Sequence, residues 1–207
     1  MGPSTGLCMR MSGAPAGMGL LAWMLVCLLA APLALSNPSS DEAETHKPLV
    51  VVLHGLGRTR ISMWLFASRL EEAGFRVHRI GYRSLDRSPD EIIDTVSRQI
   101  NECCAGHAGG VHFVGHSLGG LLIRAYLQNN RVYALGRVVL IGTPNQGAKL
   151  VDRLRDNGFL SLLGPTAAAL GTDSASLPGR LPAPYSPVGV IAGVNRGEWN
   201  DHWLPGA

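Results

Sequence analysis

The chain has 207 residues, of which 46% are hydrophobic and 16% are charged. This composition excludes an intrinsically disordered chain, because disorder requires low hydrophobicity and high charge. The formal net charge is +3 and no basic run is present, so a nucleic-acid partner is not expected. The four cysteines are too few for a disulfide scaffold of this length. The length favours one domain.

The first 36 residues have the pattern of an export signal. Residues 1–36 contain one charged side chain, Arg10, and an uninterrupted apolar run at residues 20–31, followed by a proline and small residues. This order is typical of a secretory signal peptide. We therefore expect an exported protein, either secreted or periplasmic. The alternative is an uncleaved membrane anchor at residues 18–35, a run near the lower length limit for a spanning helix.

Residues 37–47 separate this signal from the rest of the chain. They are polar and include three acidic residues, so we expect a flexible linker. The remaining residues, 48–207, are long enough for one well-buried core and form the predicted domain. Cys103 and Cys104 are the cysteines of this domain. Adjacent cysteines do not readily pair with each other, so we interpret both as small apolar side chains at a helix end.

Apolar periodicity predicts alternating strands and helices. Buried strands are expected at short runs of β-branched and other apolar residues, namely residues 48–53, 75–80, 111–114, 137–141 and 188–192. Helices are expected between them at residues 61–73, from Ser88 onward, and at residues 118–126, 148–155 and 162–170. Ser88 and Glu91 form a capping-box pattern around Pro89. Strands separated by helices imply an α/β fold, with a mostly parallel sheet covered by helices on both faces.

The chemistry of the chain is concentrated in one motif, Gly115-x-Ser117-x-Gly119. The motif directly follows a predicted strand and directly precedes a predicted helix, which is the context that a nucleophile elbow requires. In such a turn, a strained backbone presents the serine hydroxyl above the carboxyl end of the sheet, and flanking glycines let neighbouring backbone approach. We therefore predict Ser117 as a catalytic nucleophile. The alternative is a serine that only caps a helix.

Two backbone N–H groups are predicted to bind the oxyanion. In acyl-transfer sites of this layout, one N–H belongs to the residue after the nucleophile, here Leu118, and the other to a loop after an earlier strand. That loop is residues 54–57, and we assign the second N–H to Leu56. We interpret His54 as a residue that orders this loop. His116 lies on a tight turn beside the nucleophile and is also interpreted as structural.

Together these segments resemble the α/β-hydrolase superfamily, and within it the small secreted bacterial lipases and esterases. The matching segments are residues 50–57, 111–122 and 141–147, and the resemblance covers about residues 48–193. It implies hydrolysis of a small-molecule or lipid carboxylic ester through an acyl-enzyme on Ser117. It also implies that no cofactor is needed and that residues 143–147 border the acyl pocket.

The sequence departs from this family pattern after the nucleophile. The superfamily orders its triad as serine, acid, histidine, and His202 is the one histidine that follows Ser117. The chain stops at Ala207, before the family's last strand, helix and histidine loop. We therefore expect a C-terminally incomplete domain in which the triad acid and base are not evident. The alternative recruits His202 as base and Asp173 as its orienting acid.

Other functions use the same fold and remain open. A catalytically impaired fragment or a non-catalytic binding protein would keep the fold, and an acyltransferase or amidase would keep the site. The stretch between residues 141 and 188 is short for a large lid, which favours short or medium acyl chains, with triacylglycerols as a further candidate. No Cys/His set has the spacing of metal ligands, so no metal site is predicted. The oligomeric state has no signature in the sequence.

Overall fold

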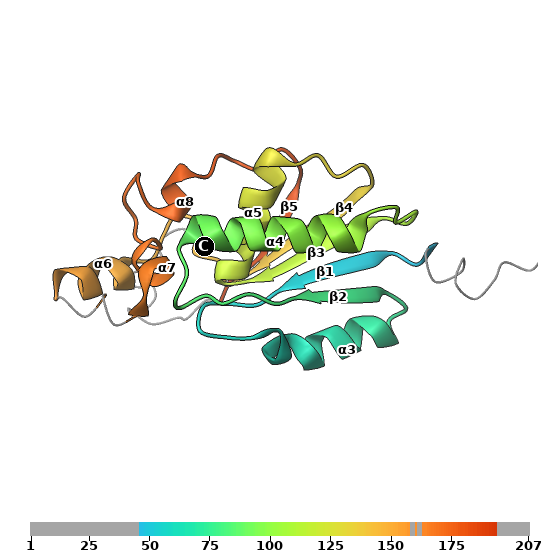
Figure 1. Cartoon of the computed structure of the whole chain (residues 1–207), viewed down its shortest axis with the longest axis horizontal. Helices are drawn as coiled ribbons and strands as arrows, with labels where there is room; N and C mark the ends of the chain where they lie inside the picture. Colours follow the sequence, from blue (N-terminus) through green and yellow to red (C-terminus); the bar gives the residue numbers. More distant parts are fainter. Residues whose placement is uncertain (1–45, 158–159, 161–162, 194–207) are drawn as a thin grey trace, which may run out of the picture. The chain divides into compact units, whose positions relative to one another are not determined.

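The computed structural model describes residues 46–157, 160 and 163–193. Its five strands are β1 (Leu49–Leu53), β2 (Arg76–Ile80), β3 (Val111–His116), β4 (Leu135–Ile141) and β5 (Val188–Ile191). They form one sheet in the order β2-β1-β3-β4-β5, and every neighbouring pair is parallel (Figure 1). The predicted α/β fold is confirmed, and each strand lies within about two residues of its predicted bounds.

In the described part of the chain, seven helical segments lie between these strands. They are the 3-10 helix η1 (Arg60–Met63), α3 (Trp64–Glu72), α4 (Pro89–Cys104), α5 (Leu118–Asn129), α6 (Lys149–Asp156), α7 (Pro165–Ala168) and α8 (Leu177–Arg180). The capping box of α4 forms as predicted, because Ser88 N donates to Glu91 Oε2 at 2.8 Å and Glu91 N donates to Ser88 Oγ at 3.3 Å. Cys103 and Cys104 end α4 as free thiols, partly buried against the core.

Two predicted helices were wrong in detail. The predicted helix at residues 61–73 is divided into η1 and α3, because Thr59 makes short local bonds with Ile61 N and Ser62 Oγ that favour a tighter first turn. The predicted helix at residues 162–170 is reduced to α7, since Gly164 before it has a φ of 84° that no helix contains. The four-residue helix α8 was missed because so short a segment carries no periodic pattern.

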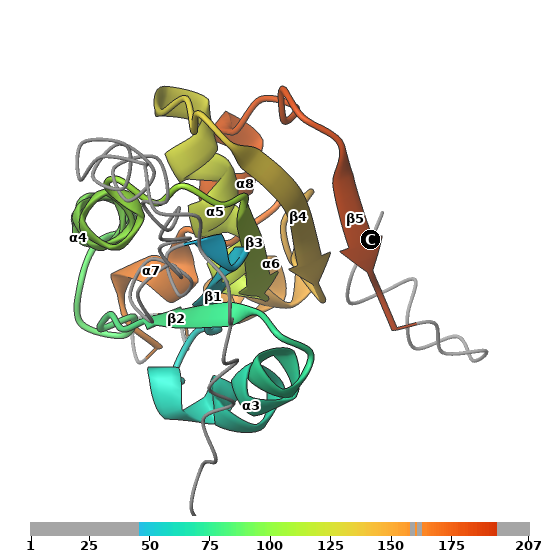
Figure 2. The same ribbon diagram turned by 90° about the vertical axis from the view of Figure 1, so that its right-hand side faces the viewer.

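Different helices cover the two faces of the sheet. Along β1, Leu49, Val51 and Leu53 belong to the core cluster formed with α4 and α5. Val50 and Val52 belong to a second cluster, formed with α3. Figure 2 shows α3 on one side of the sheet and α4 and α5 on the other. All five residues of β1 are buried, as expected for a central strand of a doubly covered parallel sheet.

Several predictions fall outside this part of the chain. The predicted signal peptide at residues 1–36, most of the linker, and every residue after Gly193 are not among the described residues. Export, membrane anchoring and the missing last strand and helix therefore stay predictions. Within residues 46–157, 160 and 163–193, no helix has both the length and the apolar character that crossing a bilayer requires.

Candidate active site

Ser117 lies in a strained turn between β3 and α5. Its φ is 53° and its ψ is −120°, and it is the one non-glycine residue of positive φ in the described chain. Two backbone hydrogen bonds hold the turn: Ser117 N donates to Ile141 O at 2.8 Å, and Gly120 N donates to Ser117 O at 3.0 Å. A non-glycine residue in such a conformation costs about 1–3 kcal/mol and persists only where its surroundings enforce it. The turn therefore has the backbone geometry that was predicted for a nucleophile elbow.

Glycines bring main chains into direct contact around this turn. A Cβ at Gly115 would lie 2.5 Å from Cα of Gly120, and a Cβ at Gly119 would lie 2.6 Å from the carbonyl oxygen of Leu53. No side chain fits at either position, as the steric interpretation of the motif requires. Gly120 was not singled out from the sequence, although a Cβ there would clash with Thr143. The second glycine of the Gly119-Gly120 pair is the feature of the sequence that could have indicated this close contact.

The loop after β1 runs directly beside the serine. A Cβ at Gly55 would lie 3.2 Å from Cβ of Ser117 and 2.9 Å from Nδ1 of His116. Leu118 opens α5, so its N–H is among the first amides of the helix, which have no acceptor within the helix. The two segments predicted to supply the oxyanion donors, through Leu56 and Leu118, therefore meet at Ser117. The exposed ring of His116 lies against the same loop.

His54 is buried beneath this loop and is bonded to it. Its Nδ1 donates to Gly55 O at 2.9 Å, and its ring stacks on Tyr82 with the ring centroids 4.0 Å apart. The hydroxyl of Tyr82 donates to the carbonyl oxygen of His54. Burial lowers the pKa of His54 and raises that of Tyr82, so both side chains are neutral at neutral pH. The arrangement fits the predicted ordering role of His54, whereas no sequence signal had indicated Tyr82.

A second loop, residues 142–147, is held against α5 by Arg124. Its Nη1 donates to the backbone O and to Oδ1 of Asn145 at 3.1 and 3.2 Å. Its Nη2 donates to the carbonyl oxygens of Leu181 and Pro182 at 3.0 and 3.2 Å. Burial lowers the pKa of Arg124, and the four oxygens partly replace the lost hydration. Arg124 thus joins the loop predicted to border the acyl pocket to the chain beyond α8.

The carboxylate of Asp173 is hydrogen-bonded to α6 and to its own loop. Its Oδ2 accepts a hydrogen bond from Arg155 Nη1 at 3.1 Å, and its Oδ1 accepts one from Ala175 N at 3.0 Å. The bond from Arg155 holds the pKa of this carboxyl below its usual range. His202 lies outside the described residues, so its pairing with Asp173 stays a prediction. Within the described chain, no three His, Cys, Asp or Glu residues are placed to hold a metal ion.

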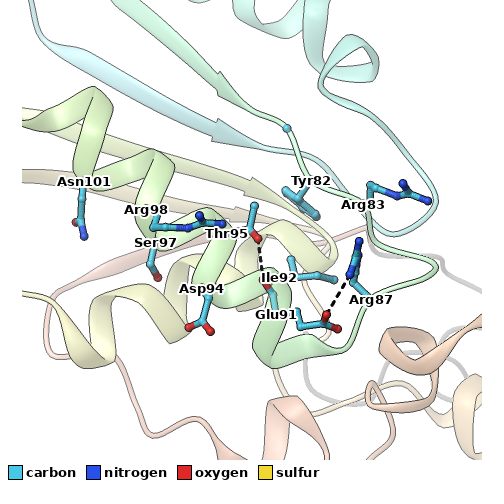
Figure 3. A pocket seen from close by; sticks show the side chains of 11 residues that line it. Tyr82, Arg83, Arg87, Glu91, Ile92, Asp94, Thr95, Ser97, Arg98 and Asn101 are labelled. Carbon is cyan, nitrogen blue, oxygen red and sulfur yellow. Dashed lines mark hydrogen bonds and ion pairs between the residues drawn. The ribbon is translucent and has the colours of Figure 1, made fainter.

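Several cavities of the described chain lie away from this turn. Four of them have none of Ser117, Leu56 and Leu118 among their lining residues. The largest of the four, about 890 Å³, lies along α4 and is lined mainly by polar and charged side chains, including the ion pair of Arg87 with Glu91 at 3.2 Å (Figure 3). Because the groove is not lined by Ser117 or by the predicted oxyanion residues, it is not the candidate acyl site.

Comparisons with known proteins agree with this geometry. Residues 49–177, more than half of the chain, match the family model of palmitoyl protein thioesterases. The lipase BlEst2 of Bacillus licheniformis, in its mature form, is similar with a TM-score of 0.54 and 21% identity over 61% of this chain and 55% of that chain. A candidate thioesterase from Silicibacter sp. TM1040 has a TM-score of 0.53 and 20% identity over 77% of this chain and 60% of that chain. The comparison with curated proteins gives no match.

The two solved structures show the fold alone at these identities, and the chain spans between 55% and 60% of their lengths. Their likeness confirms the predicted fold. The family match goes further, because it covers β1 to β4, the turn at Ser117 and the start of α8. The chain is an α/β hydrolase and belongs to the palmitoyl protein thioesterase family.

Proposed function

We propose that this protein hydrolyses acyl thioesters, with Ser117 Oγ as the nucleophile. The observation that carries the proposal is the strained turn at Ser117, packed against the loop at residues 54–57. Membership of the thioesterase family supports a thioester as substrate, in place of the simple carboxylic ester expected from the sequence. An acyl group of palmitoyl length replaces the short or medium chain of that expectation.

The proposed reaction proceeds through an acyl-enzyme. Ser117 Oγ attacks the carbonyl carbon, and the oxygen that becomes negative accepts hydrogen bonds from the N–H groups of Leu56 and Leu118. The positive end of the α5 dipole adds to this stabilisation. The carbon–sulfur bond then breaks and the thiol leaves. Since a thiol has a pKa of about 8.5, it needs less help from a general acid than an alcohol does. Water then releases the fatty acid and restores Ser117.

A general base must accept the proton of Ser117. His54 does not fit this role, because its ring is fully buried and its Nδ1 is bonded to Gly55. Within the given sequence, His202 is the one histidine that follows the serine, as the family order requires of the base, so we keep it as the candidate to be tested. The His202→Ala variant should then lose hydrolysis while the fold is retained. Full activity of that variant would exclude His202.

The test compares the full chain with its Ser117→Ala variant on three substrates: a palmitoyl thioester, a butyryl thioester and a palmitoyl oxyester. The wild-type protein should turn over the palmitoyl thioester with the highest kcat/KM, and Ser117→Ala should lower that value by about 10³-fold or more. Ser97→Ala, at a serine of α4 away from the turn, is the matched control and should keep the wild-type rate. Undiminished activity of Ser117→Ala would refute Ser117 as the nucleophile. A higher kcat/KM on the palmitoyl oxyester would refute the thioester as the preferred substrate and favour an esterase.

A further inference from the structure

Three large apolar side chains project into solvent from η1 and α3. Ile61, Trp64 and Leu65 are 73%, 59% and 60% exposed. Their spacing of three and four residues places them on one face of the helical segment. The other face, with Phe66 and Leu70, packs on the sheet. Single exposed apolar residues are ordinary, but a cluster of this kind marks an interaction surface. We call Ile61, Trp64 and Leu65 the α3 patch.

The α3 patch lies at the end of the sheet where Ser117 is found. It follows the loop at residues 54–57 after three residues, and Figure 1 shows η1 and the start of α3 at the end toward which the strands point. Leu85 is a further exposed apolar side chain at this loop: it is 50% exposed, and a Cβ at Gly57 would lie 3.8 Å from its Cδ2. Exposed apolar side chains therefore lie close to the segment proposed to bind the oxyanion, after it in the chain at Ile61 and beside it at Leu85.

The surroundings of the patch are positively charged. Residues 55–87 contain seven arginines and three acidic residues. Arg69 and Arg83 pair with Glu72 and Asp86, which uses two of the acids, and Arg87 pairs with Glu91 outside this segment. Arg58 and Arg60, next to the patch in the sequence, are exposed and form no ion pair with any residue that the structure describes. A partner for this surface must therefore present apolar groups beneath negative charges.

We propose that the α3 patch, with Arg58 and Arg60, docks the protein on the surface of an anionic phospholipid membrane. Tryptophan, isoleucine and leucine enter the boundary between headgroups and acyl chains, where tryptophan is favoured, and the guanidinium groups pair with lipid phosphates. Docking at this end brings the loop beside Ser117 to the bilayer. Delivery of a lipid-borne acyl substrate rests on the proposed function, whereas docking itself does not depend on Ser117.

Vesicle binding of the full chain tests the proposal. The probes are vesicles of phosphatidylcholine alone and of phosphatidylcholine with phosphatidylserine, and binding is measured by sedimentation. Ile61→Ser/Trp64→Ser/Leu65→Ser should weaken binding to the anionic vesicles at least about tenfold. Arg58→Gln/Arg60→Gln should weaken it about fivefold per arginine, with little change on neutral vesicles.

Matched controls separate this surface from general loss of apolar area or charge. Tyr133→Ser/Leu150→Ser removes exposed apolar side chains elsewhere, and Arg98→Gln/Arg137→Gln removes two exposed arginines elsewhere. Both controls should bind like the wild type. Equal vesicle binding by the patch variants and the controls would overturn the proposal, and a protein would then be the candidate partner of the α3 patch.

Hydrolysis is scored separately. Turnover of a water-soluble butyryl thioester should be unchanged in the patch variants, which shows that they fold. Ser117→Ala should bind vesicles like the wild type. If vesicle binding depends on the patch but the protein has no hydrolytic activity, the proposed function is wrong and the docking surface is supported. If the protein hydrolyses thioesters but vesicle binding does not depend on the patch, the docking proposal is wrong and the proposed function is supported.

Discussion

The β3–α5 turn and the β4–β5 crossover are held in place by different means. At the turn, main chain packs on main chain, and Gly115 and Gly119 leave no room for a Cβ. In the crossover, polar side chains bond to residues distant in the sequence: Arg124 of α5 donates to Leu181 O, and Asp152 accepts hydrogen bonds from Thr172 N and Thr172 Oγ1. Close backbone packing leaves the nucleophile no room to move, whereas the crossover is held by side-chain hydrogen bonds that a substitution can remove one at a time.

The largest expected effect breaks the packing of the turn. Gly115→Ala should lower the free energy of unfolding by about 3 kcal/mol, because the new methyl group meets backbone atoms of α5 that cannot rotate away. Gly189→Ala in β5 is the matched control, since a Cβ there would lie 3.7 Å from its nearest neighbour. Urea denaturation measures both variants. Equal stability of the two would mean that β3 and α5 are not in backbone contact.

The crossover should respond to loss of its arginine. Arg124→Lys should lower the free energy of unfolding by about 2 kcal/mol, because one ammonium cannot replace hydrogen bonds to four oxygens, three of which are in partly buried contacts. Amide hydrogen exchange at residues 142–147 should accelerate while that of β3 stays unchanged. Arg131→Lys, at an exposed arginine 4.2 Å over the Tyr185 ring, should alter neither. Acceleration across the whole sheet would contradict the local role of Arg124.

Relief of backbone strain at Ser117 should give a smaller effect, and it should raise the free energy of unfolding. Ser117→Gly should be more stable than Ser117→Ala by about 1 kcal/mol, because glycine adopts a φ of 53° without steric cost. Both variants should lack hydrolytic activity, so the pair isolates strain from chemistry. Thermal or urea unfolding distinguishes them. An alanine variant as stable as the glycine variant would show that the turn is not strained.

The pH dependence of stability tests the buried histidine. Burial lowers the pKa of His54 in the folded protein, while the unfolded chain keeps the ordinary value of about 6.5. Below that value the unfolded state binds more protons, so the free energy of unfolding should fall as the pH decreases toward the lowered pKa. His54→Gln should show a weaker fall, with His78 and His112, whose pKa values are also lowered, supplying what remains. Identical pH profiles for the two proteins would contradict this role of His54.

The same contrast explains what could be predicted from the sequence. The strands, the cap of α4 and the turn at Ser117 depend on local signals: short apolar runs, a Ser-Pro-x-Glu start, and glycines at fixed spacing. Tyr82 and Arg124 act on backbone 28 and 57 residues away, and nothing local marks those contacts. The prediction of a helix at residues 162–170 was wrong because Gly164 has a positive φ and packs against Leu85, a contact that no local signal indicates.

The most direct test of Ser117 as the nucleophile is to identify the residue with which a fluorophosphonate reacts. The reagent phosphonylates an activated serine, and mass spectrometry of the digested full chain identifies the modified residue. We expect one adduct on Ser117, its absence in Ser117→Ala, and protection by a palmitoyl thioester. An unmodified Ser117, or an adduct on another serine that persists in Ser117→Ala, would contradict it.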